Sequence, residues 1–319
     1  MRKPAWLSLL FITCSASTFA QYRVCECASS FSPLAAADFE SFFDPSLIKS
    51  KRITEVKIYI TSGQKNNKNK SDTAIKVIDQ KYIEEIFTFN REGYAIHNNT
   101  FYFSKPTYYY SFNRDMKNNI MQHVSQFFDS TGKISAHSKP EITDYSFDGY
   151  GNIVKRKKRN FNGTVLPDEK SEYMITEYNN QGWKMKETTH YYGDWEESSH
   201  HFTITYYTYT NKGKTETAKT YDDKKLFLRT ITNYDDMGAP LTISSFNYFM
   251  NKPAYKMVFK YDSLGRLIKY VQSSGVGGGS ECADRGNFSN EFKYNSDGLL
   301  IEQRHQFANT LCILQFEYK

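Results

Sequence analysis

The chain has 319 residues, of which 24% are charged and 16% aromatic, and its formal net charge is +6. This charge is mild and spread along the chain, which argues against nucleic-acid binding but permits contact with anionic surfaces. Beyond the N-terminal region, no stretch approaches the ~20 apolar residues that a membrane-spanning helix needs.

The first 20 residues have the charged, apolar and small-residue order of a secretory signal peptide. Two basic residues precede the apolar run 6–12, and residues 17–20 supply the small side chains that a signal peptidase requires. We therefore predict an exported protein whose mature chain begins at Gln21, in the periplasm, at the outer-membrane surface or outside the cell. An N-terminal lipid anchor at Cys14 is an alternative, because this cysteine also follows an apolar stretch.

Four cysteines remain after the predicted signal: Cys25, Cys27, Cys282 and Cys312. Four thiols in an exported chain usually form two disulfides. A bridge between Cys25 and Cys27 would be strained, so we expect each to pair with one of the two C-terminal cysteines. Which of them pairs with which stays open. The spacing gives no compact set of zinc ligands, and we predict neither a metal nor a cofactor.

Residues 21–50 are predicted to form an N-terminal segment with a short helix near residues 34–43, ending before Pro45. Residues 51–319 form the predicted repeat domain. There an aromatic residue, Asp or Asn, two variable residues and Gly recur, most clearly as Tyr-Asp-Ser-Leu-Gly-Arg-Leu at residues 261–267. Residues 112–113 and 221–222 look like copies whose glycine has been replaced. The candidate turn glycines are Gly132, Gly151, Gly182, Gly213, Gly238, Gly265 and Gly298.

The chemistry of this repeat predicts a β-hairpin. Asp or Asn accepts a hydrogen bond from a backbone amide two residues on, which starts a turn. Glycine supplies the positive φ that closes the turn as a hairpin with a bulge. Met257 and Phe259 alternate with Lys256 and Lys260, as in a sheet with one packed and one wet face. We predict an all-β fold in which antiparallel hairpin repeats build a long twisted or curled sheet, spiral-like or shell-like.

The repeat core resembles the YD repeats of the Rhs and teneurin-like families, over roughly residues 87–301. The resemblance implies hairpin sheets that curl into spirals or shells and serve adhesion, carbohydrate binding or toxin encapsulation, with no catalysis by the repeats. The chain is short and its repeat spacing is uneven, which argues against a closed toxin-encapsulating shell. The combination of export and these repeats resembles small exported YD-repeat proteins of Bacteroidetes-type bacteria.

Two aromatic clusters and one basic run are the candidate ligand-binding residues. They are Tyr108, Tyr109, Tyr110; Tyr191, Tyr192, Trp195; and Lys155, Arg156, Lys157, Lys158, Arg159. Exposed aromatic side chains can stack on sugar rings, although most tyrosines of such a sheet cover its faces. Alternation places the five cations on both faces of a strand. This pattern indicates either an edge strand or strand end protected by lysines, or a contact with an acidic glycan, a lipid headgroup or a protein.

These features favour an exported, non-enzymatic binding or scaffold protein of the cell envelope. Its tyrosine-rich β surface would face a glycan or an envelope or secreted protein. Two alternatives stay open: an immunity or chaperone-like partner of a secreted toxin system, and a glycan-active enzyme. The second is kept because the carboxylate pair of a glycosidase need not be close in the chain. We predict no catalytic residue.

Overall fold

A computed structural model describes residues 43–65, 75–77, 81–102, 105–129, 131–135, 139–159, 164–165, 172–191, 201–222, 224–247, 254–274, 287–307 and 310–319. The predicted signal peptide, Cys14 and the predicted 34–43 helix, apart from Phe43, lie outside these residues. So do Cys25, Cys27 and Cys282, and the disulfides therefore stay a prediction. Cys312 is buried in the last strand, with 3% of its surface exposed.

The described chain is almost entirely β-structure. Its elements are α3 (Pro45–Ser50), β1 (Glu55–Lys65), β2 (Ile75–Val77), β3 (Tyr82–Phe89), β4 (Ala95–Tyr102), β5 (Lys105–Arg114), β6 (Ile120–Phe127), β7 (Glu141–Phe147), β8 (Ile153–Lys158), β9 (Tyr173–Tyr178), β10 (Lys184–Tyr191), β11 (His201–Thr210), η3 (Asn211–Gly213), β12 (Thr215–Asp222), β13 (Lys225–Tyr234), β14 (Pro240–Asn247), β15 (Tyr255–Tyr261), β16 (Leu267–Ser274), β17 (Phe288–Tyr294), β18 (Leu300–Phe307) and β19 (Thr310–Tyr318).

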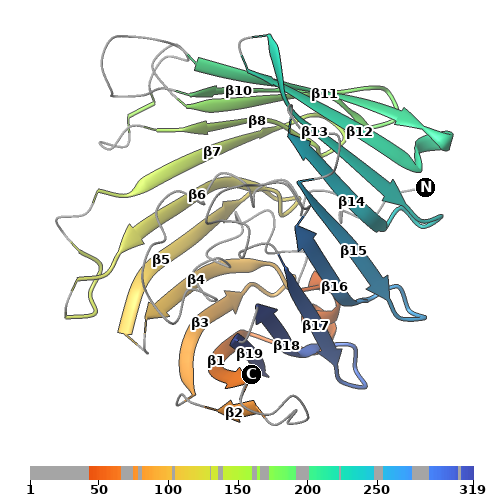
Figure 1. Cartoon of the computed structure of the whole chain (residues 1–319). Coiled ribbons are helices and arrows are strands. Elements are labelled where there is room, and N and C mark those ends of the chain that lie inside the picture. The colour runs from red at the N-terminus through yellow and green to blue at the C-terminus, as the bar shows by residue number, and fades with distance from the viewer. Residues whose placement is uncertain are drawn as a thin grey trace.

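The strands form a closed antiparallel barrel. From β3 to β19 each strand pairs with its neighbours in sequence, and β1 pairs with both β3 and β19. Of the nineteen strands, the three-residue β2 lies beside β1, which leaves eighteen in the ring (Figure 1). The predicted open sheet or curled shell is therefore wrong. An open sheet leaves unpaired backbone groups along two edges, whereas pairing of β1 with β19 removes both edges.

The repeats fold as hairpins with one recurring set of hydrogen bonds. The backbone N–H of Asp262 donates to the carbonyl of Arg266 at 2.9 Å, and that of Gly265 donates back to Asp262 at 3.0 Å. Asp262 Oδ1 also accepts from the N–H groups of Leu264 and Arg266. The same pair of backbone bonds begins at Asn90, Asp115, Asp129, Asp148, Asn179, Asp235 and Asn295.

All seven candidate turn glycines have a positive φ, between 75° and 88°. The two copies without glycine differ from the sequence-based register. The first turn begins at Asp115 rather than near residue 113, and Asn118 takes the glycine position with φ 64°. In the second, Asp222 itself pairs with Lys225 in a tighter hairpin, and Lys224 has φ 67°.

The aromatic residue of the repeat ties neighbouring hairpins together. The hydroxyl groups of Tyr178, Tyr261 and Tyr294 donate to main-chain carbonyls of the preceding hairpin. In each case the acceptor lies two residues beyond the turn glycine of that hairpin. Tyr318 of β19 makes the same bond, 2.6 Å long, to the carbonyl of Leu300. Buried Tyr hydroxyl groups need such acceptors, which is the physical reason that Tyr precedes the turn acid.

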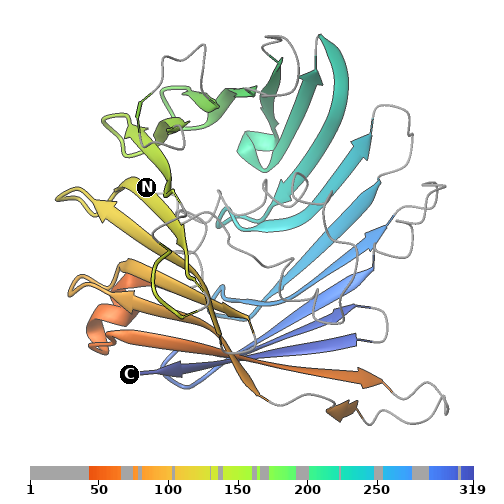
Figure 2. The same ribbon diagram turned by 90° about the vertical axis from the view of Figure 1, so that its left-hand side faces the viewer.

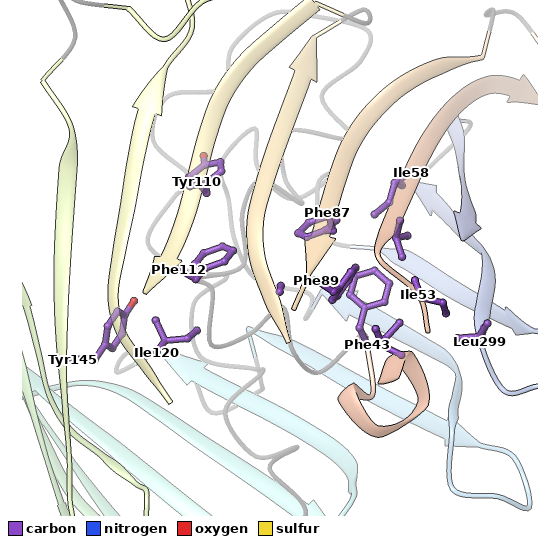
Figure 3. Packing of buried hydrophobic residues seen from close by; sticks show 13 residues of the cluster. Phe43, Ile53, Ile58, Phe87, Phe89, Tyr110, Phe112, Ile120, Tyr145 and Leu299 are labelled. Carbon is purple, nitrogen blue, oxygen red and sulfur yellow. The ribbon is translucent and has the colours of Figure 1, made fainter. Parts of the chain in front are cut away.

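Buried side chains occupy one face of the ring, which we call the inner face. The largest cluster joins α3 to β1 and β3: Phe43 packs with Phe87 and Phe89 at ring-centroid distances of 5.7 and 5.4 Å (Figure 3). The side chain of Asp44 caps α3 by accepting from the backbone of Ser46. In β15, Met257 and Phe259 are buried while Lys256 and Lys260 are exposed, so the predicted alternation is confirmed.

The opposite, outer face is partly ion-paired and also carries exposed apolar side chains such as Ile175, Val258 and Val271. Cross-strand pairs join Lys186 to Glu177 and Lys269 to Glu291, with N–O distances of 2.8 and 2.7 Å. Within the described ranges, no helix has the length and apolar character needed to cross a membrane.

The two ends of the barrel are built differently. Odd-to-even connections, from β3–β4 to β17–β18, lie at one end, which we call the turn end. The helix α3 and the last residue, Lys319, lie there too (Figure 2). Even-to-odd connections lie at the opposite end and vary in length, from the short links β4–β5, β12–β13 and β18–β19 to the long segment between β8 and β9. The turn that begins at Asp129 belongs to the opposite end, in the β6–β7 connection.

Candidate functional site

The basic run is divided between the two faces of a strand inside the sheet. β8 pairs with both β7 and β9, so the edge-strand interpretation is wrong. Lys155 and Lys157 share the outer face with Ile175 of β9, which is 37% exposed. Arg156 and Lys158 occupy the inner face, where Lys158 Nζ lies 3.1 Å from a carboxylate oxygen of Glu172.

Arg159 follows β8 and forms a two-pronged ion pair with Asp144 of β7, with N–O distances of 2.7 and 2.8 Å. Partial burial acts to raise the pKa of Asp144. The hydrogen bonds from Arg159 and Gln122 outweigh it and hold that pKa below its usual value. Arg159 is therefore held by Asp144, which also lies near Lys157, and Lys155 and Lys157 are the outward cations within β8 itself.

A small pocket lies beside the inward half of the run. It is lined by Arg156, Lys158, Glu172, Tyr173, Met174 and Thr189, and its volume is about 10 Å³. This is room for roughly one water molecule, so the pocket does not hold an organic ligand. Among the described residues, no three His, Cys, Asp or Glu side chains gather as a metal-binding group.

The first aromatic cluster does not form one surface. Tyr108 and Tyr110 are on the inner face, stacked at 6.0 Å, and Tyr110 is buried, which raises its pKa. Tyr109 points outward and its hydroxyl lies 2.8 Å from Nδ1 of His97. Of the second cluster, Tyr191 ends β10 at the opposite end and is 42% exposed. Tyr192 and Trp195 lie outside the described residues.

A column of aromatic rings crosses the outer face beside Lys155. The ring of Tyr173 stacks on His190 at 4.2 Å and 16°, and His190 lies 5.9 Å from Phe202. Lys155 Nζ is 5.1 Å from the Tyr173 centroid, on the β8 side. Lys155 lies against one side of the Tyr173 ring and His190 against the other. A ligand at this column would therefore meet polar ring edges and a cation, and not an open aromatic face. Sequence reasoning missed Tyr173 and Phe202, although the turn at Asn179 was recognised and fixes the pairing of β9 with β10.

The two faces of β8–β13 differ in net charge. Outward positions carry five cations and one acid: Lys155, Lys157, Lys186, Lys219, Arg229 and Glu177. Five minus one gives a net charge of +4 on this surface, which we call the basic face. The inner face of the same strands carries the acids Glu187, Glu216 and Asp222 together with the cations Arg156, Lys158 and Lys184. Glu216 is only 4% exposed.

Comparison with known proteins gives structural likeness only. No protein-family profile matches the chain, and no curated protein is significantly similar. A porin-like protein from Bacteroides uniformis has a TM-score of 0.38 at 7% identity, and the match covers 84% of this chain and 98% of that one.

The Photorhabdus luminescens Tc holotoxin pore has a TM-score of 0.27 at 12% identity. The match includes 75% of this chain but only 13% of the toxin chain. Transferrin Binding Protein B from Haemophilus parasuis has a TM-score of 0.21 at 11% identity. The match includes 83% of this chain and 75% of that protein. At such scores these likenesses carry no argument about function.

Proposed function

We propose that this chain is an exported, non-enzymatic binding protein of the cell envelope that holds an acidic glycan on the basic face of β8–β13. The observation that carries the proposal is the excess of positive charge on the outer face, where five cations and one acid lie, whereas the inner face of the same strands carries both cations and acids. The basic and apolar N-terminal residues support export, and the Asp-led hairpins support the likeness to YD repeats.

The chemistry of the basic face favours a polymer with repeated negative groups. Lys155 and Lys157 lie two residues apart on one strand, which separates their Cα atoms by about 7 Å. Exposed ion pairs contribute only about 0.2–1 kcal/mol each, so useful affinity requires several contacts at once. A polysaccharide bearing carboxylate or sulfate groups can meet cations on successive strands. Neutral sugars gain little here, because both sides of the Tyr173 ring are covered.

The test is binding of the signal-free protein to an array of acidic and neutral polysaccharides at low and physiological salt. We expect acidic polymers to bind at low salt and to weaken as salt screens the exposed charges. The double variant K155E/K157E should lose about tenfold or more in affinity, equivalent to about 1.4 kcal/mol. The matched control is K256E/K260E, which reverses two exposed cations on the outer face of β15.

Equal losses in both double variants would show that net charge, not this surface, drives binding. Salt-insensitive binding to a neutral sugar would contradict the acidic-glycan proposal. Absence of glycan binding, together with capture of an envelope protein that K155E/K157E no longer captures, would keep the surface but replace the partner.

A further inference from the structure

Two adjacent carboxyl groups lie at an irregularity in β3, far from the basic face. Ile58 of β1 pairs with Glu85, but the next residue, Tyr59, pairs with Ile83. Glu84 is therefore the extra residue of a β-bulge, and bulges redirect side chains and often lie next to functional sites. Glu85 follows the bulge on the inner face, opposite Thr100 of β4.

An asparagine on the neighbouring strand points at Glu85. Asn98 of β4 is only 2% exposed and makes a side-chain hydrogen bond with Glu85. Oδ1 of Asn98 and Oε2 of Glu85 are both buried, and neither has a hydrogen-bond donor among the described residues. Leaving a buried acceptor unsatisfied costs about 1–3 kcal/mol, so two such oxygens on neighbouring residues mark a position where a donor or a cation belongs.

The charges around this position do not balance. In the described part of the chain, no cationic side chain acts on either carboxyl group. Buried carboxylates in proteins are normally paired with a cation or coordinate a metal.

We propose that Glu84, Glu85 and Asn98 form a site for a hard divalent cation of the Ca²⁺ type, on the inner wall of the barrel. The donor set consists of carboxylate and amide oxygens, which suit Ca²⁺, Mg²⁺ and Mn²⁺ rather than zinc or copper. The hydroxyl-bearing Thr100 and Tyr110 are the cross-strand neighbours of Glu85 and Asn98. The bound ion would join β3 to β4 and would supply the positive charge that both carboxyl groups lack.

The experiment measures thermal unfolding of the full chain at pH 7.5 after treatment with a chelator. Adding Ca²⁺ should raise the melting temperature, because a cation that binds only the folded state stabilises it by mass action. Mg²⁺ and Mn²⁺ are tested in parallel.

The variant Glu85→Gln keeps the shape of the side chain but removes its charge, and it should lose the temperature shift. The control is Glu291→Gln, which changes an outward acid paired with Lys269 and should retain the shift. If Glu85→Gln does not fold, Glu84→Gln replaces it. The proposal is overturned if none of the three cations shifts unfolding of the unmodified chain, or if Glu85→Gln responds like the unmodified chain. Glycan binding by Glu85→Gln should be unchanged, which separates this site from the basic face.

Discussion

The turn end and the opposite end of the barrel solve the same problem, reversing a strand, in different ways. At the turn end, one pattern of Asp or Asn, two variable residues and a residue with positive φ recurs around the ring. At the opposite end the connections vary in length, and Tyr191 and Arg159 lie at or next to their strand ends there. Local hydrogen bonds therefore determine the conformation and length of the connections at the turn end. At the opposite end, the length of the connection differs from one hairpin to the next.

The largest effect is expected where the turn end contacts α3. A Cβ atom on Gly93 would lie 2.0 Å from the carbonyl oxygen of Pro45, and φ at this glycine is 87°. Gly93→Ala should therefore lower the free energy of unfolding by about 4 kcal/mol or more, because both the backbone and the helix must move. Gly265→Ala meets open space and should cost only about 1–2 kcal/mol, the strain of left-handed backbone. Urea unfolding of both variants measures the difference. Equal losses of unfolding free energy in the two variants would show that the contact between α3 and the turn at Gly93 adds nothing to the cost of the substitution.

A second effect concerns the inner face of β17 and β18, where buried polar residues gather. His305 is 7% exposed, its Nδ1 lies 3.2 Å from Asn290, and burial lowers its pKa to about 4. The unfolded state, with a histidine pKa of about 6.5, binds this proton first, so stability is present above that value and is lost as pH falls towards 4. The full loss is about 3 kcal/mol. His305→Gln should flatten this slope in unfolding measured between pH 7 and 4. If the unfolding free energy of His305→Gln falls with pH as steeply as that of the unmodified chain, the pH dependence comes from other groups.

A smaller effect is expected from a single tie between hairpins. Tyr294→Phe removes the hydroxyl that donates to Leu267, and leaves that carbonyl without this bond. We expect a loss of about 1 kcal/mol in unfolding free energy. Tyr150→Phe is the control at the same end of the barrel, because Tyr150 is 87% exposed at a turn tip. A loss in Tyr150→Phe as large as that in Tyr294→Phe would refute the assigned role of the tie.

The smallest effect belongs to the opposite end. Tyr191→Ser changes a side chain that is 42% exposed at the end of β10. Its unfolding free energy should change by no more than about 0.5 kcal/mol, as for most surface substitutions. A change above about 2 kcal/mol, the scale of core substitutions, would show that this end is as tightly determined as the turn end.

The sequence was sufficient for the hairpins because their determinants are local. Asp262, Gly265 and the alternation of Met257 with Lys256 act within a few residues of one another. Closure of the ring could not be predicted in this way. It depends on the pairing of β1 with β19, in which Val56 lies opposite Tyr318. The sequence of neither strand shows which distant strand it pairs with. The misplaced turn near residue 113 shows a related limit, because Asn118 replaced the glycine that marks the other copies.

The candidate site was predicted only in part. Lys155 and Lys157 were named, but the run 155–159 was treated as one unit, and alternation sends its members to two faces. The column of Tyr173, His190 and Phe202 depends on the register between three strands, two of which are joined by a long connection. Glu85 and Asn98 carry no sequence signal, because burial and a missing hydrogen-bond donor appear only when the strands are placed together.

Closure of the ring also has a consequence for biosynthesis. The backbone N–H of Thr54 bonds to the carbonyl of Lys319, a separation of 265 residues, and β1 completes its pairing only with β19. A growing chain can form hairpins one after another, but it must hold β1 and its newest strand as exposed edges until residues 310–319 are available. Such edges are prone to pair with other chains. A chain that crosses a membrane unfolded would face the same interval after translocation. Chaperones that cover strand edges would therefore matter most for yield in the time before β19 is available.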